Sequence, residues 1–501
     1  MRVPGIARDR YVLSPNAHAV AGSGGPGATL SACMADEVAI VGAGPTGLLL
    51  AGDLAAAGVP CTVLERRAGE SNLTRAFGVH ARTLELLDAR GLADELLATG
   101  TTVDRLRVLG GAVLDLAWLP SRFPFMLITP QYQTERLLER RARALGARIV
   151  EGVEVTGLRQ DADGVELELR SQEGATERRR VAYVVGADGV RSTVRGALGL
   201  GFPGRSAVQS MMLADVRLRE TPGEALSIAA GPEGFALVAS FGDGWHRVIA
   251  WNRARQLHDG APVDFDDLRE TTRGCYGTDF GMHDPRWTSR FHSDERQVAR
   301  YRSGRVLLAG DAAHVHSPAG GLGMNAGLQD AANLGWKLAA QAHGRAPAGL
   351  LDSYHAERHP VGRSTVRTSA TMLRFALARS RVLRATRGPL ARAVTRIPPL
   401  NRRVTGFVSG IAIAYPDGGR RASDLALTGG GRLYEALRAG RFVLVSPAGD
   451  GVPDAWADRV DHAVADGERL LVRPDGYVAW SARDGGLRAA LARWCGPPAR
   501  S

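Results

Sequence analysis

Residues 37–65 constrain the fold more than any other stretch of this chain. An apolar segment, 37–41, runs directly into Gly42-Ala43-Gly44-Pro45-Thr46-Gly47, which has the pattern G-x-G-x-x-G. A run of small residues then leads to a second apolar segment, 61–64, which ends at Glu65. Two strands joined by a Gly-rich turn and a helix form a βαβ unit, and this arrangement predicts a dinucleotide-binding site.

Each position of the Gly-rich loop has a physical reason. Gly42 allows the tight turn, Gly44 lets the backbone approach a pyrophosphate, and Gly47 lets the helix pack closely against the strand. The helix that follows the loop offers free N–H groups and the positive end of its dipole, which attract phosphate. A fortuitous Gly-rich turn is the alternative. The two flanking strands, and an acidic residue placed to accept hydrogen bonds from a ribose, argue against it.

The composition fits a globular protein of two or three domains. The chain has 501 residues, of which 45% are hydrophobic. Its formal charge is +11, but nearly all basic residues are Arg and Lys337 is the only lysine, which is typical of a GC-rich coding sequence. We interpret the basic residues as dispersed. Because no nucleic-acid-binding motif accompanies them, we predict no nucleic-acid partner.

The cysteines and the apolar segments bear on the cellular compartment of the protein. The four cysteines have no C-x-x-C spacing, which excludes a zinc ribbon or a dithiol motif and favours the cytoplasm. No segment is long and apolar enough for an integral membrane helix. Residues 1–33 lack the apolar core of a signal peptide. We interpret them as a disordered extension, or as sequence that precedes a natural start at Met34.

Two further motifs pair a strand with a Gly-Asp turn. Tyr183–Arg195 reads Y-V-V-G-A-D-G-V-R-S-T-V-R, which predicts a strand, a tight turn and a helix. Arg305–His314 reads R-V-L-L-A-G-D-A-A-H, a buried strand that ends in Gly-Asp. A Gly-rich turn and a helix with many small residues follow at 317–338.

The remaining segments are less specific. Strand-like runs within 206–293, separated by Gly and Pro, are compatible with a sheet that forms one wall of a pocket. Residues 374–403 are rich in Arg with apolar residues between. A solvated helix with Arg on its outer face is the favoured interpretation there, and a membrane-surface or partner-binding helix is the alternative. From about residue 415 the pattern indicates a separate small α/β domain.

Together, the three motifs resemble those of the single-component (class A) FAD-dependent aromatic hydroxylases, over roughly residues 37–365. The end of the chain resembles the thioredoxin-like C-terminal domain of the phenol hydroxylase and aromatic polyketide hydroxylase branch. This resemblance implies an α/β fold with a Rossmann-like FAD-binding domain interleaved with a mixed-sheet substrate domain. The expected division is a discontinuous FAD domain (34–205 and 294–375), a substrate sheet (206–293), a helical linker (376–414) and a thioredoxin-like domain (415–501).

The resemblance also implies which residues contact FAD, and these expectations are assigned motif by motif. The FAD pyrophosphate would lie on Gly42, Gly44, Pro45, Thr46 and Gly47. The adenosine ribose would bond Glu65, with Arg66 near the adenine. Further contacts to the phosphate and ribityl chain would come from Arg75, Gln131 and Asp311, and Asp188 belongs to a motif linked to both FAD and NADPH. The flavin pyrimidine edge would face the backbone of Gly321, Leu322, Gly323, Met324 and Asn325.

Structural explanations compete with several of these roles. Asp311 can be a simple helix N-cap, and Arg66 and Arg75 can be surface charges. His314 and His316 look catalytic in isolation, but we favour a structural role for each. We expect no metal site, because no further ligands gather around them. No general base or other catalytic residue is assigned.

The activity implied is an NADPH- or NADH-consuming monooxygenase that uses O₂. It would hydroxylate a phenolic or polycyclic aromatic, polyketide-type substrate through a flavin C4a-hydroperoxide. A Baeyer–Villiger-type or antibiotic-modifying oxygenase on the same scaffold is an alternative, as is a non-catalytic flavoprotein that binds a small molecule. A halogenase is disfavoured because no W-x-W-x-I-P segment is present. We expect a monomer or a homodimer.

Overall fold

The structure, a computed structural model, describes residues 37–498 except 70–75, 109–111, 232, 259–260, 378–380 and 417–418. The extension expected at 1–33 lies outside the described residues. Helices and strands are mixed throughout the described part, and the predicted α/β fold class is confirmed. The expected domain boundaries stay a prediction.

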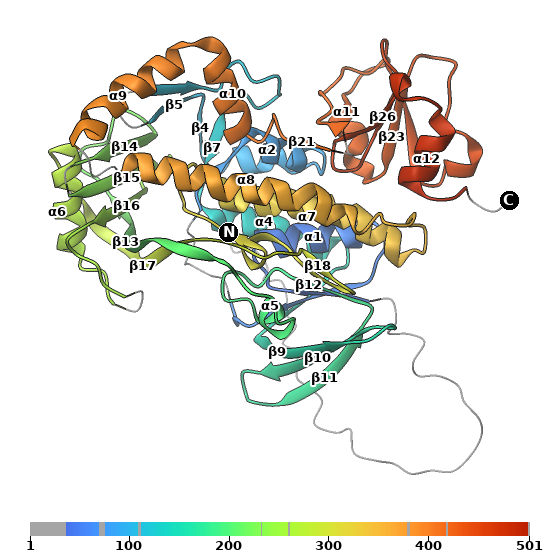
Figure 1. Cartoon of the computed structure of the whole chain (residues 1–501), viewed down its shortest axis with the longest axis horizontal. Coiled ribbons are helices and arrows are strands. Elements are labelled where there is room, and N and C mark those ends of the chain that lie inside the picture. Colours follow the sequence, from blue (N-terminus) through green and yellow to red (C-terminus); the bar gives the residue numbers. More distant parts are fainter. Residues whose placement is uncertain are drawn as a thin grey trace, which may run out of the picture.

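A six-stranded central sheet contains the first motif (Figure 1). All of its strands are parallel except one edge strand. The inner strands β1, β2 and β12 are buried along their whole length because both faces of the sheet are covered. In spatial order the strands are β18 (Arg302–Ser303), β19 (Val306–Leu308), β12 (Tyr183–Gly186), β1 (Val38–Val41), β2 (Cys61–Glu65) and β8 (Arg148–Glu151).

Helices cover one face of this sheet, and a three-stranded antiparallel sheet with a short helix lies on the other (Figure 1). Small residues let the helices α1 and α7 approach closely, since a Cβ on Gly327 would lie 2.4 Å from the Thr46 hydroxyl. The helices are α1 (Pro45–Ala56), α4 (Gln131–Ala144), α7 (Leu322–Ala342) and α8 (Ser353–Ala376). The opposite face has β9 (Val153–Gln160), β10 (Val165–Ser171), β11 (Thr176–Val181) and α5 (Thr193–Ala197).

Short elements between residues 78 and 128 complete this part of the molecule. They form a three-stranded sheet, a hairpin and two helices. They are β3 (Gly78–Val79), α2 (Ala81–Asp88), α3 (Ala93–Leu97), β4 (Thr101–Val103), β5 (Arg105–Val108), β6 (Ala112–Asp115) and β7 (Met126–Ile128).

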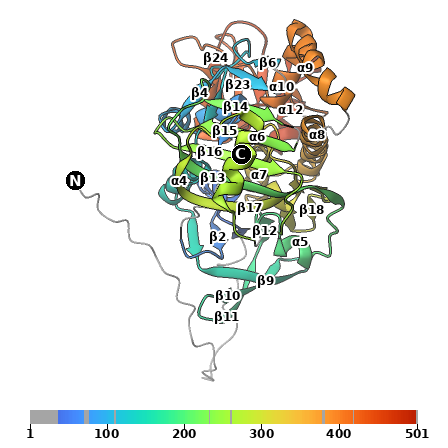
Figure 2. The ribbon, with the colours of Figure 1, turned by 90° about the vertical axis from the view of Figure 1, so that its left-hand side faces the viewer.

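A second large sheet lies beside the first, as Figure 2 shows in green. Its helix α6 (Phe265–Tyr276) packs on one face over a core that includes Met212, Val238 and Leu268. In spatial order the strands are β14 (Leu226–Ala230), β15 (Gly234–Ser240), β16 (His246–Asn252), β13 (Gly204–Arg217), β17 (His283–Gln297) and β20 (His314–Val315).

Two helices connect α8 to the C-terminal domain. They are α9 (Arg381–Arg396) and α10 (Pro398–Val408), and both pack on β6. Pro398 and Pro399 occupy the first turn of α10, where their missing N–H groups cost nothing. Within the described ranges, none of the helices combines the length and apolarity that crossing a membrane requires.

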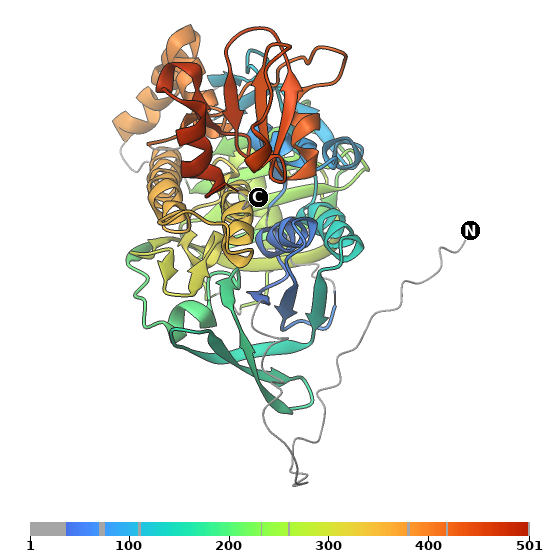
Figure 3. The same cartoon turned by 90° about the vertical axis from the view of Figure 1, so that its right-hand side faces the viewer.

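The C-terminal domain has a mixed four-stranded sheet, and Figure 3 shows it in red above the helices of the FAD-binding part. Only the β23–β24 pair is parallel. Cys495 is buried, and burial raises the pKa of its thiol, which disfavours the reactive thiolate. The main elements are α11 (Leu433–Ala436), β23 (Phe442–Ser446), β24 (Val460–Val464), β25 (Leu470–Val472), β26 (Val478–Ser481) and α12 (Leu487–Cys495).

A buried ionic network joins this domain to α7 and α8. Arg473 donates to both oxygens of Glu357, at 2.8 and 2.9 Å, and also to Asp475. Lys337 donates to Glu357 at 2.8 Å. None of these four side chains is more than 2% exposed. Burial and the neighbouring Arg473 lower the pKa of Lys337 to about 7.

Candidate functional site

The three Gly-rich motifs meet at one edge of the central sheet. Strand register places Val41 beside Leu64 on one side and beside Gly186 on the other, and Gly186 beside Leu308. Val41, Gly186 and Leu308 each end a parallel strand, and Leu64 lies one residue before the end of β2, so the turns that follow lie next to one another. In an open parallel sheet the carboxyl ends of the strands form the ligand-binding edge. The fold and this edge define a dinucleotide-binding protein.

The first loop has the backbone geometry that its glycines predict. Gly42 has φ +106°, and a Cβ on it would lie 2.4 Å from the carbonyl oxygen of Ala187. A Cβ on Gly47 would lie 2.1 Å from the carbonyl oxygen of Gly42. A Cβ on Gly44, in contrast, would meet nothing within 4 Å. Gly42 and Gly47 are therefore required by close packing, whereas the surface above Gly44 is open for a ligand.

The carboxylate of Glu65 lies at the end of β2 and faces the loop. It accepts hydrogen bonds from the Ala43 N–H at 2.8 Å and from the backbone N–H and Nε of Arg67 at 3.0 and 2.8 Å. Burial opposes its ionisation, but these bonds outweigh it and lower the pKa of Glu65. Glu65 is thus a fixed anion that holds the loop, with lone pairs left for a hydroxyl donor.

The expected adenosine side of the site is a pocket between β1, β2, β9 and the start of α5. Gly42, Arg66, Asp188 and Arg191 are among its lining residues. Arg66 is exposed. One oxygen of Asp188 accepts from the Val194 N–H at 3.1 Å, while the other is buried without a partner in the described residues. Burial raises the pKa of Asp188.

The Gly310-Asp311 turn lies against the start of α1. A Cβ on Gly310 would lie 2.8 Å from the Thr46 hydroxyl, and the Gly310 N–H donates to Asp330 at 3.1 Å. Asp311 is exposed, within the 3-10 turn Gly310–Ala312. The alternative that Asp311 is a helix N-cap is wrong, because Ala309 occupies the cap of this turn and Gly321 the cap of α7.

The start of α7 is held by backbone conformation and by one amide. Gly320 and Gly321 have φ +85° and +62°, which only glycine adopts readily, and no side chain caps the helix. The N–H groups of Leu322, Gly323 and Met324 therefore lack intrahelical partners. The side chain of Asn325 accepts from the His80 N–H at 2.9 Å and donates to Gly78 and Gly321, which ties the helix to β3.

The two histidines after the turn differ in environment. His314 donates from Nε2 to Asp330 at 2.6 Å, and Arg358 pairs with the other oxygen of that carboxylate at 2.7 Å, so His314 has a structural role. His316 bonds the Ser317 carbonyl through Nδ1 at 2.9 Å. Burial lowers the pKa of His316 to about 4, which keeps it neutral near pH 7. Its Nε2 is buried near Gly323 without a partner in the described residues.

Gln131 and Arg75 belong to segments expected to reach the flavin. Arg75 lies outside the described residues. Gln131 accepts from the Ala76 N–H at 3.1 Å and donates to Glu135 at 2.7 Å, so its amide fixes the chain that follows Arg75. Arg247, fully buried, donates to the Ala76 carbonyl at 3.1 Å.

Sequence reasoning missed three residues that shape this region. His80 donates from Nε2 to the Gly320 carbonyl at 2.8 Å and so holds the turn before α7. Arg247 pairs with Asp215 at 2.8 and 2.9 Å and links the second sheet to the FAD-binding part. Arg67 neutralises Glu65. Only Arg67, two residues after the acid that ends β2, had a local signal. No group of His, Cys, Asp and Glu suited to a metal ion occurs among the residues that the structure describes.

Comparisons with known proteins identify the family. The FAD binding domain family matches residues 35–369, and the C-terminal domain of aromatic-ring hydroxylases matches 415–498. A rifampicin monooxygenase from Streptomyces venezuelae is 41% identical over 468 residues, covering 89% of this chain and 96% of that protein. A dialkyldecalin synthase from Streptomyces rugosporus is 38% identical over 487 residues, covering 93% and 100%. The structure of an anhydrotetracycline hydroxylase from Streptomyces rimosus has a TM-score of 0.82 and 40% identity, covering 92% and 99%.

The chain belongs to the FAD-dependent aromatic-ring hydroxylase family of flavoprotein monooxygenases. The resemblance inferred from the three motifs is thereby confirmed, as are the enzyme class and FAD as its cofactor. The thioredoxin-like C-terminal domain agrees with the second family match.

Proposed function

We propose that the protein uses NADPH or NADH and O₂ to hydroxylate a phenolic or polycyclic aromatic compound of polyketide type. The observation that carries this proposal is the meeting of all three FAD motifs at one sheet edge, beside a separate strand-rich domain. Two relatives, a rifampicin monooxygenase and an anhydrotetracycline hydroxylase, support the substrate class.

The residues at the sheet edge fit FAD. The open surface above Gly44 suits the pyrophosphate, with the N-terminus of α1 directed at it. Glu65 suits a ribose hydroxyl. The uncapped start of α7 offers N–H groups that favour negative charge on a bound ring. FAD, when bound, supplies the redox chemistry that reduces O₂ and inserts one of its oxygen atoms into an aromatic ring.

The protein's own contribution is positioning and electrostatics. His80 and Asn325 fix the turn and the first turn of α7, and so aim these N–H groups. In this proposal, Asp188 and Asp311 accept hydrogen bonds from cofactor hydroxyls. The buried Arg247–Asp215 pair keeps the second sheet in register with the segment at Ala76.

We expect Glu65→Gln to weaken FAD binding about tenfold or more, because it removes the charge that orders the loop and a charged hydrogen bond is worth about 1.5–3 kcal/mol. FAD titration of the apoprotein, followed by fluorescence, measures the affinity. Glu151→Gln is the matched control, since Glu151 lies beside Glu65 in the register of β8. An affinity unchanged in Glu65→Gln would remove Glu65 from the cofactor site.

The activity itself is tested by following flavin absorbance without oxygen as NADPH or NADH is added, with and without a polyphenolic polyketide. We expect bleaching that accelerates when the aromatic compound is present. After admission of ¹⁸O₂, we expect a product heavier by one labelled oxygen atom. Flavin that neither nucleotide reduces, under any ligand tried, would contradict the proposal.

One relative supports a second candidate function. The dialkyldecalin synthase matches over its whole length, and its name describes ring formation rather than oxygenation. A flavoprotein that binds a polycyclic precursor without oxygenating it is therefore the alternative. Product formation that proceeds unchanged without NAD(P)H and O₂ would favour this alternative over a hydroxylase.

A further inference from the structure

The excess of positive over negative charge lies in one segment of the chain. Residues 359–416 contain 11 Arg and neither Asp nor Glu. The whole chain has 63 basic and 52 acidic residues, so the rest of the chain holds 52 of each and is formally neutral. The basic residues themselves are dispersed, since 52 of the 63 lie outside this segment, but the net charge is not. The excess of +11 belongs to the C-terminal part of α8, to α9, to α10 and to the residues that connect them.

Large apolar side chains are exposed in the same segment. Leu390 is 57% exposed, Ile397 48% and Leu400 41%, all within 11 residues at the corner between α9 and α10. Pro398 and Pro399 at this corner are exposed as well. Removing such side chains from water is favourable, so three of them exposed together mark a surface that a partner would cover.

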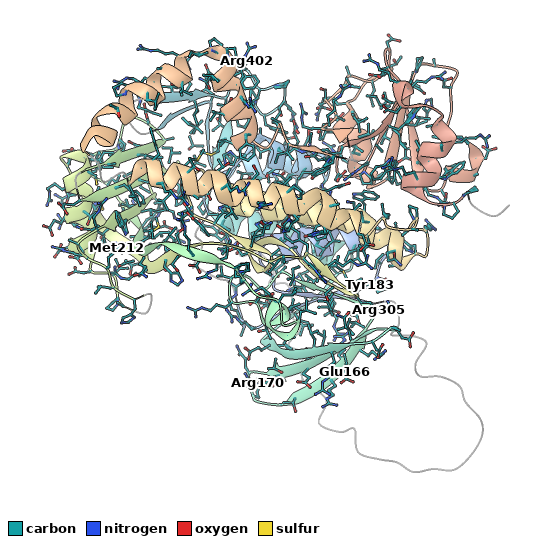
Figure 4. The ribbon with its side chains drawn as sticks, in the orientation of Figure 1. Glu166, Arg170, Tyr183, Met212, Arg305 and Arg402 are labelled. Carbon is teal, nitrogen blue, oxygen red and sulfur yellow. The ribbon has the colours of Figure 1, made fainter. Side chains whose placement is uncertain are left out.

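Arginines that have no acidic partner among the described residues flank this apolar corner. Arg396, Arg402 and Arg403 are exposed, and within the described ranges no carboxylate pairs with any of them. Arg402 lies 5.6 Å from the ring centre of Trp118. Figures 1 and 4 show the corner at the upper rim of the molecule, with Arg402 labelled on α10. The opposite faces of α9 and α10 pack on β6, so the corner is a fixed projection of the fold.

We propose that the α9–α10 corner docks on an anionic lipid bilayer. Exposed apolar side chains surrounded by cations match the boundary between acyl chains and acidic headgroups, into which Leu and Ile insert while Arg binds phosphate. A nucleic acid, or an acidic peptide without apolar side chains, would use the arginines but would leave Leu390, Ile397 and Leu400 in water. The apolar corner therefore favours a lipid surface over other polyanions.

Vesicle sedimentation of the full chain with bound FAD tests this docking. We expect binding to phosphatidylcholine vesicles that contain phosphatidylglycerol and little binding to phosphatidylcholine alone, with an affinity that falls as salt rises. Both Arg396→Gln/Arg403→Gln and Leu390→Ser/Ile397→Ser/Leu400→Ser should weaken binding by at least about tenfold. Flavin content and melting temperature should stay unchanged in both variants.

Matched controls test whether vesicle binding depends on the corner itself or on the total exposed charge and apolar surface of the protein. Arg178→Gln/Arg488→Gln removes the same charge from exposed positions elsewhere, and Leu145→Ser/Leu257→Ser removes side chains that are 43% and 48% exposed. Both controls should bind vesicles within about twofold of the parent, because neither alters the corner. If a control and its matching corner variant lost vesicle binding equally, the proposal would be overturned. Equal binding to vesicles with and without phosphatidylglycerol would overturn it as well. A third result would also overturn it: polyglutamate binding that depends on Arg396 and Arg403, together with vesicle binding that is unchanged in Leu390→Ser/Ile397→Ser/Leu400→Ser. That result would indicate an acidic protein partner.

Discussion

We expect Gly42→Ala to yield a folded protein that has lost most of its FAD. The new Cβ would lie 2.4 Å from the Ala187 carbonyl oxygen, and the residue would have to keep φ +106°. Strain of this kind costs about 1–3 kcal/mol. Relieving it separates the first loop from the Gly186–Asp188 turn, so FAD affinity should fall about 10- to 100-fold. Flavin content after purification and FAD titration of the apoprotein measure the loss.

Gly58→Ala is the matched control for this prediction. Gly58 also has a positive φ, +73°, but a Cβ on it would meet nothing within 4 Å. It should lower stability by about 1 kcal/mol through backbone strain and leave FAD affinity unchanged. A Gly42→Ala protein with full flavin content would show that the contact between the two turns does not control the cofactor site.

Glu357→Gln should lower the free energy of unfolding by about 3–5 kcal/mol, because it leaves the buried charges of Arg473 and Lys337 without their carboxylate. Urea unfolding followed by tryptophan fluorescence reports on this network, since Arg473 lies 5.1 Å from the ring centre of Trp336. Glu224→Gln breaks the exposed pair with Arg107 and should cost at most about 1 kcal/mol. Equal effects of the two substitutions would contradict the network's importance.

The ionisation of Glu357 should also make the free energy of unfolding depend on pH. Burial disfavours its charge, but Arg473 and Lys337 outweigh burial and lower the pKa of Glu357 to about 2 from an ordinary 4.5. Between these values the unfolded chain binds more protons than the folded one, so this stabilisation is complete above pH 4.5 and is lost as pH falls toward 2. Glu357→Gln should therefore flatten the loss of stability over that range, as measured by unfolding at successive pH values.

Local patterns were enough to predict the sheet edge. Gly42, Gly47 and the acid at the end of β2 are recognisable because their spacing within one βαβ unit is fixed by backbone geometry. The meeting of this loop with Gly186 and Gly310 could also be expected, because parallel strands present their carboxyl ends together. The cofactor roles of the individual side chains stay predictions.

Contacts between distant segments were beyond this kind of reasoning. His80 bonds Asn325 and Gly320 across about 240 residues, and no local pattern marks either contact. Arg247 looks like any strand residue until folding buries it against Asp215. The charge of residues 359–416 was visible in the sequence, but the exposure of Leu390 and Ile397 required the packing of α9 and α10 on β6.

The discontinuity of the central sheet has a consequence for folding during synthesis. β1 pairs with β12, and β12 with β19, so the sheet closes only when residue 308 has been made. The His80–Asn325 bond then spans 245 positions. Forming contacts so distant in sequence costs a large loop-closure entropy, so these contacts form slowly. We expect a ribosome-bound chain that ends before α7 to remain unable to bind FAD, so that cofactor capture marks the completion of this part of the chain.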